Sequence, residues 1–468
     1  MRVTPGSAYD RRTMEVERQS GRQMGVWAAT AVVTGEAISL GIFLTPAAMA
    51  RSLGSPALLG AVWCGMAVLT LAGALCFTEL AVRNPHDGGE YVYLRRSFGR
   101  RVAFLYGWMA ALVMYPGVAA SLCVGIVPYI QTLVPVPARL VAFVPAVLLL
   151  GLGFLTYLGA RLSSGVMTTL NWVKVPVMAA LVGWALLTGH ASMANLAPLT
   201  LRRAGSDPLI EAIAGAAISA FFCFGGWWEA GKIAGQVREP SRTLPIAFTG
   251  GVLVVTVVYL LLSLAFVAVV PMRQIQSNTA FVAQFGNALF GAAGGRVLSA
   301  CVILAVLGGL MVLSMAVPRV TYTLARGEVG DRPQGILAAL GRIDPRTGAP
   351  ANAVLLQTAM ALAILVLGAF DRILAFIIFS AVAFLALTVA TLFRVITPVR
   401  RWWFPVAPIV FIAGSGILAA MLLLHNLVPS LLGAGIVLVG LPARWLLTRD
   451  HTRSTELGST PDSLTPET

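Results

Sequence analysis

Two charged residues lie within otherwise apolar stretches of this chain, and they are the side chains best placed to carry a proton or hold an ion pair. Lys174 lies in the middle of residues 165–188, and Glu36 lies within residues 24–50. A charge inside a membrane span is costly and is by default a functional hypothesis. A desolvated lysine readily changes its pKa and could carry a proton, or it could be a permanently charged strut. Glu36 could pair with Lys174, titrate as a coupling acid, or attract a cationic substrate.

Glycines interrupt two of the apolar stretches and predict backbone that leaves helical geometry there. The first stretch contains Gly35 and Gly41, and a later one contains the adjacent pair Gly225 and Gly226. Glycine destabilises a helix interior and permits other backbone conformations. Inside a bilayer, unwound backbone is tolerated only where it lines a cavity or is buried in protein. The alternative is that these glycines only allow helices to pack closely.

The composition indicates that such stretches are membrane spans. Of the 468 residues, 58% are hydrophobic and 11% are charged, whereas soluble domains carry about 25% charged residues. A water-soluble enzyme, a disordered chain and a disulfide scaffold are thereby excluded. A span needs about 20 apolar residues, so the chain is predicted to be an all-α polytopic membrane protein with twelve transmembrane helices. The predicted spans are residues 24–50, 56–80, 102–133, 140–160, 165–188, 209–235, 245–271, 297–325, 353–370, 372–393, 403–424 and 427–447.

The basic residues predict the orientation of these spans. With the N-terminus inside, 25 of the 33 Lys and Arg residues fall on the inner side and 7 on the other. This bias places both termini in the cytoplasm. The net charge of +14 then reflects basic loops beside anionic lipids rather than a nucleic-acid partner. The first and sixth spans carry the glycine interruptions and cross in opposite directions, as expected for a transporter site between inverted halves.

Other chemistry is poorly represented in the sequence. The five cysteines lie in apolar stretches without a CxxC pair, so we expect neither disulfides nor metal ligands from them. The four histidines form no metal cluster, and no cofactor is expected. Acid–base or metal-ligand residues that converge within the spans are nearly absent, which argues against a membrane enzyme. The paired interruptions favour alternating access over a channel. Residues 1–22 lack the apolar core of a signal peptide, so we expect the first span to remain part of the protein rather than be cleaved off.

Five motifs occur in order along the chain. They are ISLGIF at 38–43; EL at 79–80 with GGEYVYL at 88–94; VAFLYGW at 102–108; FCFGGW at 222–227 with Pro240, Arg242 and Pro245; and RVTYTLARG at 319–327. Together they resemble the amino acid–polyamine–organocation transporter superfamily, especially its L-type amino-acid transporter-like branch. The sequence departs from the family pattern at Glu36, Ser39 and Leu40, and after Trp227. Glu229 and Lys232 in that last stretch could pair at i, i+3 on one face.

The resemblance implies a LeuT-like fold of two inverted five-helix repeats with discontinuous helices 1 and 6, plus two C-terminal helices. The expected segments are a cytoplasmic N-terminal segment (1–23), the first repeat (24–190), the second, inverted repeat (205–394), helices 11 and 12 (402–447) and a disordered cytoplasmic tail (448–468). Because residues 133–139 lack a cysteine, no disulfide-linked accessory subunit is expected.

The helix that restarts after the first interruption directs free N–H groups and its positive dipole end at the site, where they can hold a substrate carboxylate. The resemblance implies that carbonyls near the interruptions accept the ammonium. Phe222 is similar to an aromatic gate, or it is plain core packing. Lys174 matches a lysine of sodium-independent relatives, where sodium-coupled ones bind a sodium ion. The predicted substrate site consists of Ala37, Ile38, Ser39, Leu40, Gly41, Phe222, Cys223, Phe224, Gly225 and Gly226, with Lys174 and Glu36 as coupling residues.

The function implied is a secondary active transporter that moves amino acids across the cytoplasmic membrane without sodium, either coupled to protons or by exchange. The partners expected are a small amino acid or amine, protons and anionic lipids. The alternatives are a transporter of polyamines or organic cations, and a non-transporting amino-acid sensor of the same fold.

Overall fold

A computed structural model places most of the chain. It describes residues 24–38, 41–85, 88–157, 180, 183–185, 187–188, 191–271, 280–329, 335–344, 350–368, 370–394 and 401–456. Within these ranges the secondary structure is helical, with one isolated parallel bridge between Met24 and Val237 in place of strands. The expected all-helical class is therefore confirmed for the described residues.

The first half of the chain forms long helices joined by short ones. Its elements are α2 (Val26–Ala37), α3 (Gly41–Leu53), α4 (Pro56–Arg83), α5 (Gly89–Phe98), α6 (Arg100–Met109), the π-helical turn η1 (Ala110–Met114), α7 (Tyr115–Gly125), α8 (Val127–Leu133), α9 (Ala138–Val141) and α10 (Val144–Tyr157).

The second half follows the same pattern. Its elements are the short 3₁₀ helix η2 (Met193–Leu196), α12 (Leu209–Phe224), the 3₁₀ helix η3 (Trp227–Gln236), α13 (Pro240–Val269), α14 (Phe281–Val329), α15 (Gly335–Leu340), α16 (Ala351–Ile364), η5 (Leu365–Leu367), α17 (Phe370–Ala390), η6 (Thr391–Arg394), α18 (Val406–His425) and α19 (Leu427–Glu456).

Nine helical segments of the described chain are long and apolar enough to cross a membrane. They correspond to nine of the twelve predicted spans. The first predicted span is divided into α2 and α3, and the ninth corresponds to the shorter apolar segment Ala351–Leu367. Most of the fifth, including Lys174, lies outside the described residues. The chain is thus a multi-pass membrane protein.

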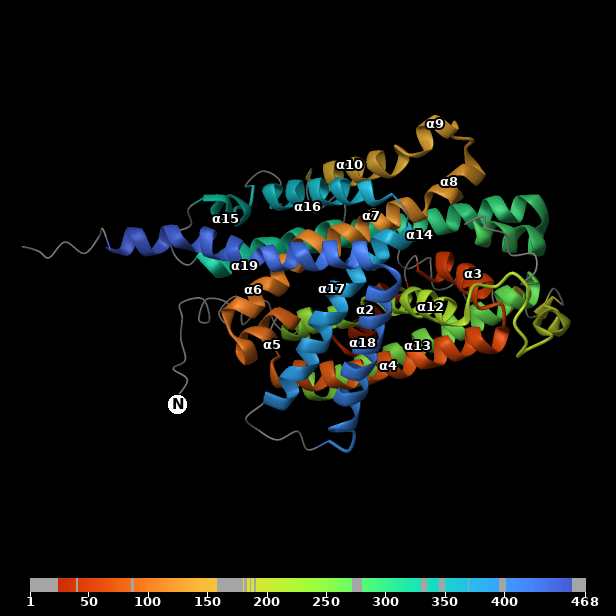
Figure 1. Cartoon of the computed structure of the whole chain (residues 1–468), viewed down its shortest axis with the longest axis horizontal. Coiled ribbons are helices and arrows are strands. Elements are labelled where there is room, and N and C mark those ends of the chain that lie inside the picture. The colour runs from red at the N-terminus through yellow and green to blue at the C-terminus, as the bar shows by residue number, and fades with distance from the viewer. Residues whose placement is uncertain are drawn as a thin grey trace, which may run out of the picture.

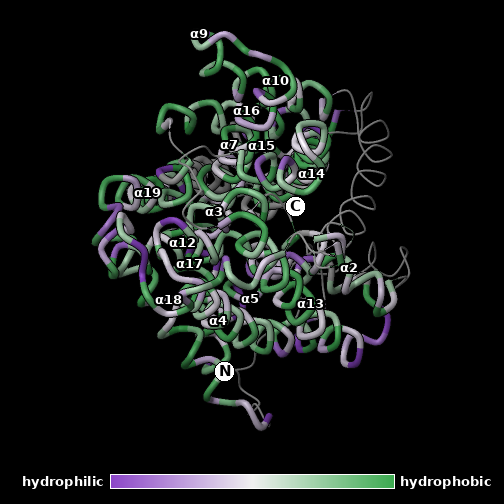
Figure 2. The backbone as a smooth tube through the Cα atoms, turned by 90° about the vertical axis from the view of Figure 1, so that its right-hand side faces the viewer, coloured by the Kyte–Doolittle hydropathy of each residue, from purple (hydrophilic) through white to green (hydrophobic). Residues whose placement is uncertain are grey.

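Most long helices run along the long axis of the molecule, with α5 and α15 at one end and α9 at the other (Figure 1). Seen along that axis, the outer helices α10, α13 and α19 are largely hydrophobic (Figure 2). Large side chains on them are exposed, among them Phe154, Leu253 and Leu438. Outward apolar side chains are expected where lipid rather than water is the solvent.

The predicted eighth and twelfth spans have different limits in the structure. Helix α14 begins at Phe281, well before the predicted residue 297, because two helices are joined across Gly291 at φ 69°. A Cβ on Gly294 would clash with the Gly286 carbonyl oxygen, so small residues permit this close turn. Helix α19 continues to Glu456, beyond residue 447.

Buried aromatic rings hold together the helices around the interruptions. The Trp63 ring on α4 lies 5.4 Å from that of Tyr259 on α13 and 6.0 Å from that of Phe224 on α12. The Trp227 ring on η3 lies 4.9 Å from that of Phe77 on α4. Such packed aromatic pairs contribute beyond their buried area, so both sides of the second interruption are fixed against the same neighbours.

Candidate functional site

The first interruption separates α2 from α3. Helix α2 ends at Ala37, and the Ile38 N–H donates to the Thr34 carbonyl at 2.8 Å. Ala37 and Ile38 are both buried, and α3 restarts at Gly41. Ser39 and Leu40 lie outside the described residues, as does the side chain of Glu36.

The second interruption lies at the predicted glycine pair. Helix α12 ends at Phe224, Gly225 is extended (φ −54°, ψ 155°), and Gly226 adopts φ 95° before η3 begins. A positive φ of this size favours glycine. The ten-residue η3 is long for a 3₁₀ helix, and such stretches often mark a hinge or a strained segment.

Tyr259 on α13 connects the two interruptions. Its hydroxyl lies 2.5 Å from the Ala37 carbonyl oxygen and 2.8 Å from that of Cys223, and it donates its hydrogen to them. Both carbonyls belong to the last turn of a helix, where intrahelical donors run out. One buried hydroxyl therefore fixes the ends of α2 and α12 relative to each other.

Helices α3 and α12 also pack closely beside the interruptions. A Cβ on Gly41 would lie 2.8 Å from the Cys223 Cα. The backbones of α3 and α12 are therefore too close here for any residue larger than glycine. The Thr45 hydroxyl lies 2.7 Å from the Cys223 Sγ. Gly41 and Cys223 thus form a helix–helix contact.

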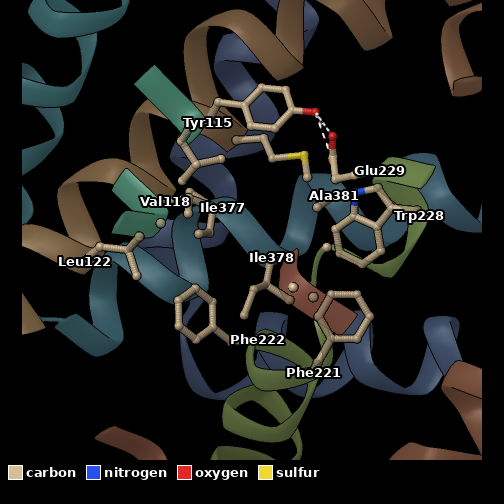
Figure 3. A pocket seen from close by; sticks show the side chains of 16 residues that line it. Tyr115, Val118, Leu122, Phe221, Phe222, Trp228, Glu229, Ile377, Ile378 and Ala381 are labelled. Carbon is tan, nitrogen blue, oxygen red and sulfur yellow. Dashed lines mark hydrogen bonds between the residues drawn. The ribbon is translucent and has the colours of Figure 1, made fainter. Parts of the chain in front are cut away.

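A cavity of about 850 Å³, including space open to the outside, lies beside the interruptions. At one end, the Tyr115 hydroxyl donates to Glu229, and Phe221 and Phe222 lie away from this polar pair (Figure 3). The lining is mostly apolar, as in small-molecule sites generally. The residues that line it are Gly35, Met114, Tyr115, Val118, Leu122, Phe221, Phe222, Gly225, Gly226, Trp228, Glu229, Gly309, Leu313, Ile377, Ile378 and Ala381.

The polar end of the cavity is internally neutralised. The Lys232 ammonium lies 2.7 and 2.8 Å from the two Glu229 carboxylate oxygens, and the Tyr115 hydroxyl lies 2.9 Å from one of them. Lys232 also contacts the Tyr115 hydroxyl. The i, i+3 pair expected between Glu229 and Lys232 is confirmed.

The structure distributes the predicted site residues between the cavity wall and the packing behind it. Phe222, Gly225 and Gly226 line the cavity, and the Phe222 ring lies 5.7 Å from that of Phe370 on α17. Phe224 instead packs on Tyr259 and Trp63. Lys174, like Ser39 and Leu40, lies outside the described residues.

Much of the cavity wall comes from residues outside the sequence motifs. Most of these residues lie on α7, α14 and α17, which are distant in sequence from the glycine motifs. Tyr115 and Glu229, for example, are 114 positions apart. The sequence could have indicated Glu229 as a site residue, because it is a charge within a span. Leu313, Ile377 and Ile378 differ in sequence from other apolar span residues in no way that would indicate a site. The described residues bring together no group of three metal-ligating side chains.

The profile of the amino acid permease family matches residues 24–439. The chain is 26% identical to the serine/threonine exchanger SteT of Bacillus subtilis (strain 168), over 90% of this chain and 95% of that protein. It is 25% identical to the mouse (Mus musculus) b(0,+)-type amino acid transporter 1, over 79% of this chain and 74% of that one.

A further relative is the large neutral amino acids transporter small subunit 2 of Rattus norvegicus, which is 28% identical over 59% of this chain and 54% of that protein. These relatives are all transporters or exchangers of amino acids by name. With a family match across nearly the whole helical region, the chain belongs to the amino acid permease family of the amino acid–polyamine–organocation superfamily.

Proposed function

We propose that this permease carries neutral amino acids across the cytoplasmic membrane by alternating access, without sodium, by exchange or coupled to protons. The observation that supports this most is the cavity beside the two interruptions, whose wall includes Gly35 before the first one and both glycines of the second. Broken helices of this kind bind substrates in transporters with inverted repeats. The LeuT-like arrangement of twelve helices, with both termini in the cytoplasm, is part of the proposal.

The interruptions offer both signs of partial charge to a zwitterion. Helix α3 begins at Gly41, and a helix N-terminus favours anions. The N–H group of Gly41, with those of Ser39 and Leu40 that precede it in the sequence, would bind the carboxylate. Carbonyls at the ends of α2 and α12 would accept the ammonium. Tyr259 supports this role because it holds the Ala37 and Cys223 carbonyls in one orientation, which reduces the ordering required when substrate binds.

The remaining wall favours a neutral, apolar side chain. Val118, Leu122, Leu313, Ile377 and Ile378 present hydrocarbon to the cavity. An apolar surface gives no compensation for a second buried charge, whose desolvation is costly.

The competing class is a polyamine or another organic cation, for which a free carboxylate in the cavity would be the expected anchor. Glu229 is the carboxylate that the structure places there, and Lys232 and Tyr115 already compensate it. This pairing favours a zwitterionic substrate over a cation. A sensor without transport activity would bind the same ligands but produce no flux.

Flux across a sealed membrane tests the proposal. The purified full chain is reconstituted into liposomes loaded with unlabelled amino acids, and uptake of labelled neutral amino acids, basic amino acids and simple amines is measured with and without sodium. We expect labelled neutral amino acids to accumulate to the same extent with and without sodium. Uptake of amines alone would support the competing class, and binding without flux would indicate a sensor.

A further inference from the structure

A second cluster of charged side chains lies behind the polar end of the cavity, where η3 meets α5. Glu90, in the first turn of α5, lies within electrostatic reach of Glu229 and Lys232 on η3 and of Tyr106 on α6. Glu229 also faces the cavity. The cluster therefore extends from the substrate cavity to the short helix α5, which lies outside the membrane-spanning segments.

Glu90 is the unusual member of this cluster. Its side chain is completely buried, at 0% exposure. No described group makes a well-aligned hydrogen bond to its carboxylate oxygens, although the Tyr106 hydroxyl and the Glu90 backbone N–H lie close enough to favour the ionised form. The hydroxyls of Tyr93 and Tyr106 are buried near it and likewise make no well-aligned hydrogen bond to a described residue. A buried carboxylate with unused acceptor sites is costly, so this arrangement requires a compensating ligand.

The charges identify that ligand as a proton. Two carboxylates share one ammonium, which leaves a net charge of −1, and a single proton neutralises the cluster. Glu229 already has the Lys232 ammonium and the Tyr115 hydroxyl as donors, so the proton belongs on Glu90. As a carboxylic acid, Glu90 becomes a donor, for which the adjacent tyrosine hydroxyl oxygens are available acceptors.

Two other charged groups near α5 are engaged with other partners. Arg96, on the same helix, binds the Asn84 side-chain oxygen. Arg394 of η6 lies over the Phe98 ring, 4.7 Å from its centre. Burial raises the pKa of Glu90 most, Lys232 lowers it and Glu229 raises it. Together with the Tyr106 hydroxyl and the Glu90 backbone N–H, which also lower it, these effects give a pKa of about 7. Glu90 therefore titrates near neutral pH, where a transporter can use it.

The backbone ties this cluster to the position of η3. The Gly88 N–H donates to the Lys232 carbonyl at 3.1 Å. A Cβ on Gly89 would lie 2.8 Å from the Lys232 Cγ, so the lysine stem packs directly on the start of α5. Just beyond the other end of η3, the Arg238 N–H donates at 2.9 Å to the carbonyl of Met24, which precedes α2. Any displacement of η3 changes the surroundings of Glu90.

We propose that Glu90, together with Glu229 and Lys232, forms a proton-binding site that couples proton uptake to the position of η3 beside the cavity. The step adds one proton from water to a carboxylate oxygen of Glu90 and breaks no covalent bond of the protein. Proton binding is a property of the folded chain alone, whereas its link to transport rests on the proposed function.

The site is tested by the pH dependence of thermal unfolding of the detergent-purified full chain. Because the raised pKa makes the folded state bind the proton more tightly, the wild-type midpoint temperature should fall as the pH rises from about 4.5 to about 7. Glu90→Gln imitates the protonated acid, so its midpoint temperature should not show this fall with rising pH. The matched control is Glu79→Gln, since Glu79 is also buried but is paired with Arg83 and Arg401. The midpoint temperature of this control should still fall as the pH rises.

Two further variants give opposite shifts that a merely structural role would not produce. Lys232→Gln removes the charge that lowers the pKa of Glu90, so the fall of the midpoint temperature should occur at higher pH. Glu229→Gln removes the charge that raises it, so the transition should move to lower pH. A Glu90→Gln profile parallel to wild type, or shifts of the same sign in the other two variants, would overturn the proposal.

A flux measurement then tests the coupling. With a pKa near 7, the protonated fraction of Glu90 falls about tenfold between pH 6 and pH 8. We expect wild-type exchange to vary with pH over this interval and Glu90→Gln exchange to vary much less. An unchanged pH profile in the variant would refute the coupling. Absence of amino acid flux in the wild type would refute the proposed function instead, and the unfolding experiment would still decide whether the proton site exists.

Discussion

Replacing Tyr259 by phenylalanine removes one hydroxyl and tests whether the two helix interruptions act as one site. The hydroxyl is fully buried and serves the Ala37 and Cys223 carbonyls at 2.5 and 2.8 Å. Its single hydrogen serves one carbonyl at a time, so its loss leaves about one buried acceptor unsatisfied. Such a loss lowers the free energy of unfolding by about 1–3 kcal/mol.

If substrate binding needs these carbonyls held in place, the same energy is lost from the binding-competent arrangement. A loss of 1–3 kcal/mol corresponds to a dissociation constant raised about 5- to 150-fold. The assay is equilibrium binding of a labelled neutral amino acid to the purified protein, with thermal unfolding measured in parallel.

Tyr129→Phe provides a matched control. Tyr129 is equally buried, and its hydroxyl donates at 2.7 Å to the Phe43 carbonyl, which lies inside α3 rather than at the end of α2 or α12. This variant should lose similar stability and keep wild-type affinity. If both variants lose stability and both bind substrate as the wild type does, the carbonyls at the interruptions do not organise the site.

Further variants and conditions test separate parts of the account. Gly41→Ala should abolish binding because its Cβ would lie 2.8 Å from the Cys223 backbone, whereas Gly60→Ala, with open space around its Cβ, should bind normally in the same assay. Burial raises the pKa of Glu90 from 4.5 to about 7, so Glu90→Gln should gain up to about 3 kcal/mol over wild type above pH 7 and nothing below pH 4.5 in denaturant titrations. Uptake should be unchanged when choline replaces sodium, and strict sodium dependence would contradict the role expected of Lys174. Glu36→Gln should reduce uptake of all amino acids, whereas selective loss of cationic substrates would show that Glu36 recognises them directly.

The interruptions were predictable from the sequence because their cause is local. Glycine alone combines a small size with freedom at positive φ, and the structure uses this freedom at Gly226. The Glu229–Lys232 pair was predictable for the same reason, since helical spacing brings the two side chains onto one face. Family resemblance adds the expectation of two inverted repeats, which periodicity alone does not determine.

The rest of the site depends on contacts between distant segments. Tyr259 lies 222 positions from Ala37, and nothing in its immediate sequence indicates that its hydroxyl joins two helix ends. Glu90 follows a glycine pair in a polar stretch, where an exposed carboxylate is the ordinary expectation. Its complete burial arises only when η3 packs across α5.

The central claim, that the cavity beside the interruptions binds the amino acid, is tested most directly by filling it. Gly309 lines the cavity, and a Cβ there would meet open space, so Gly309→Leu should occupy substrate volume without a backbone clash. Gly65→Leu, on an exposed position of α4 that also has open space, is the matched control. We predict that labelled neutral amino acids bind to the purified wild type and to Gly65→Leu but not to Gly309→Leu; equal affinity in all three proteins would contradict the account.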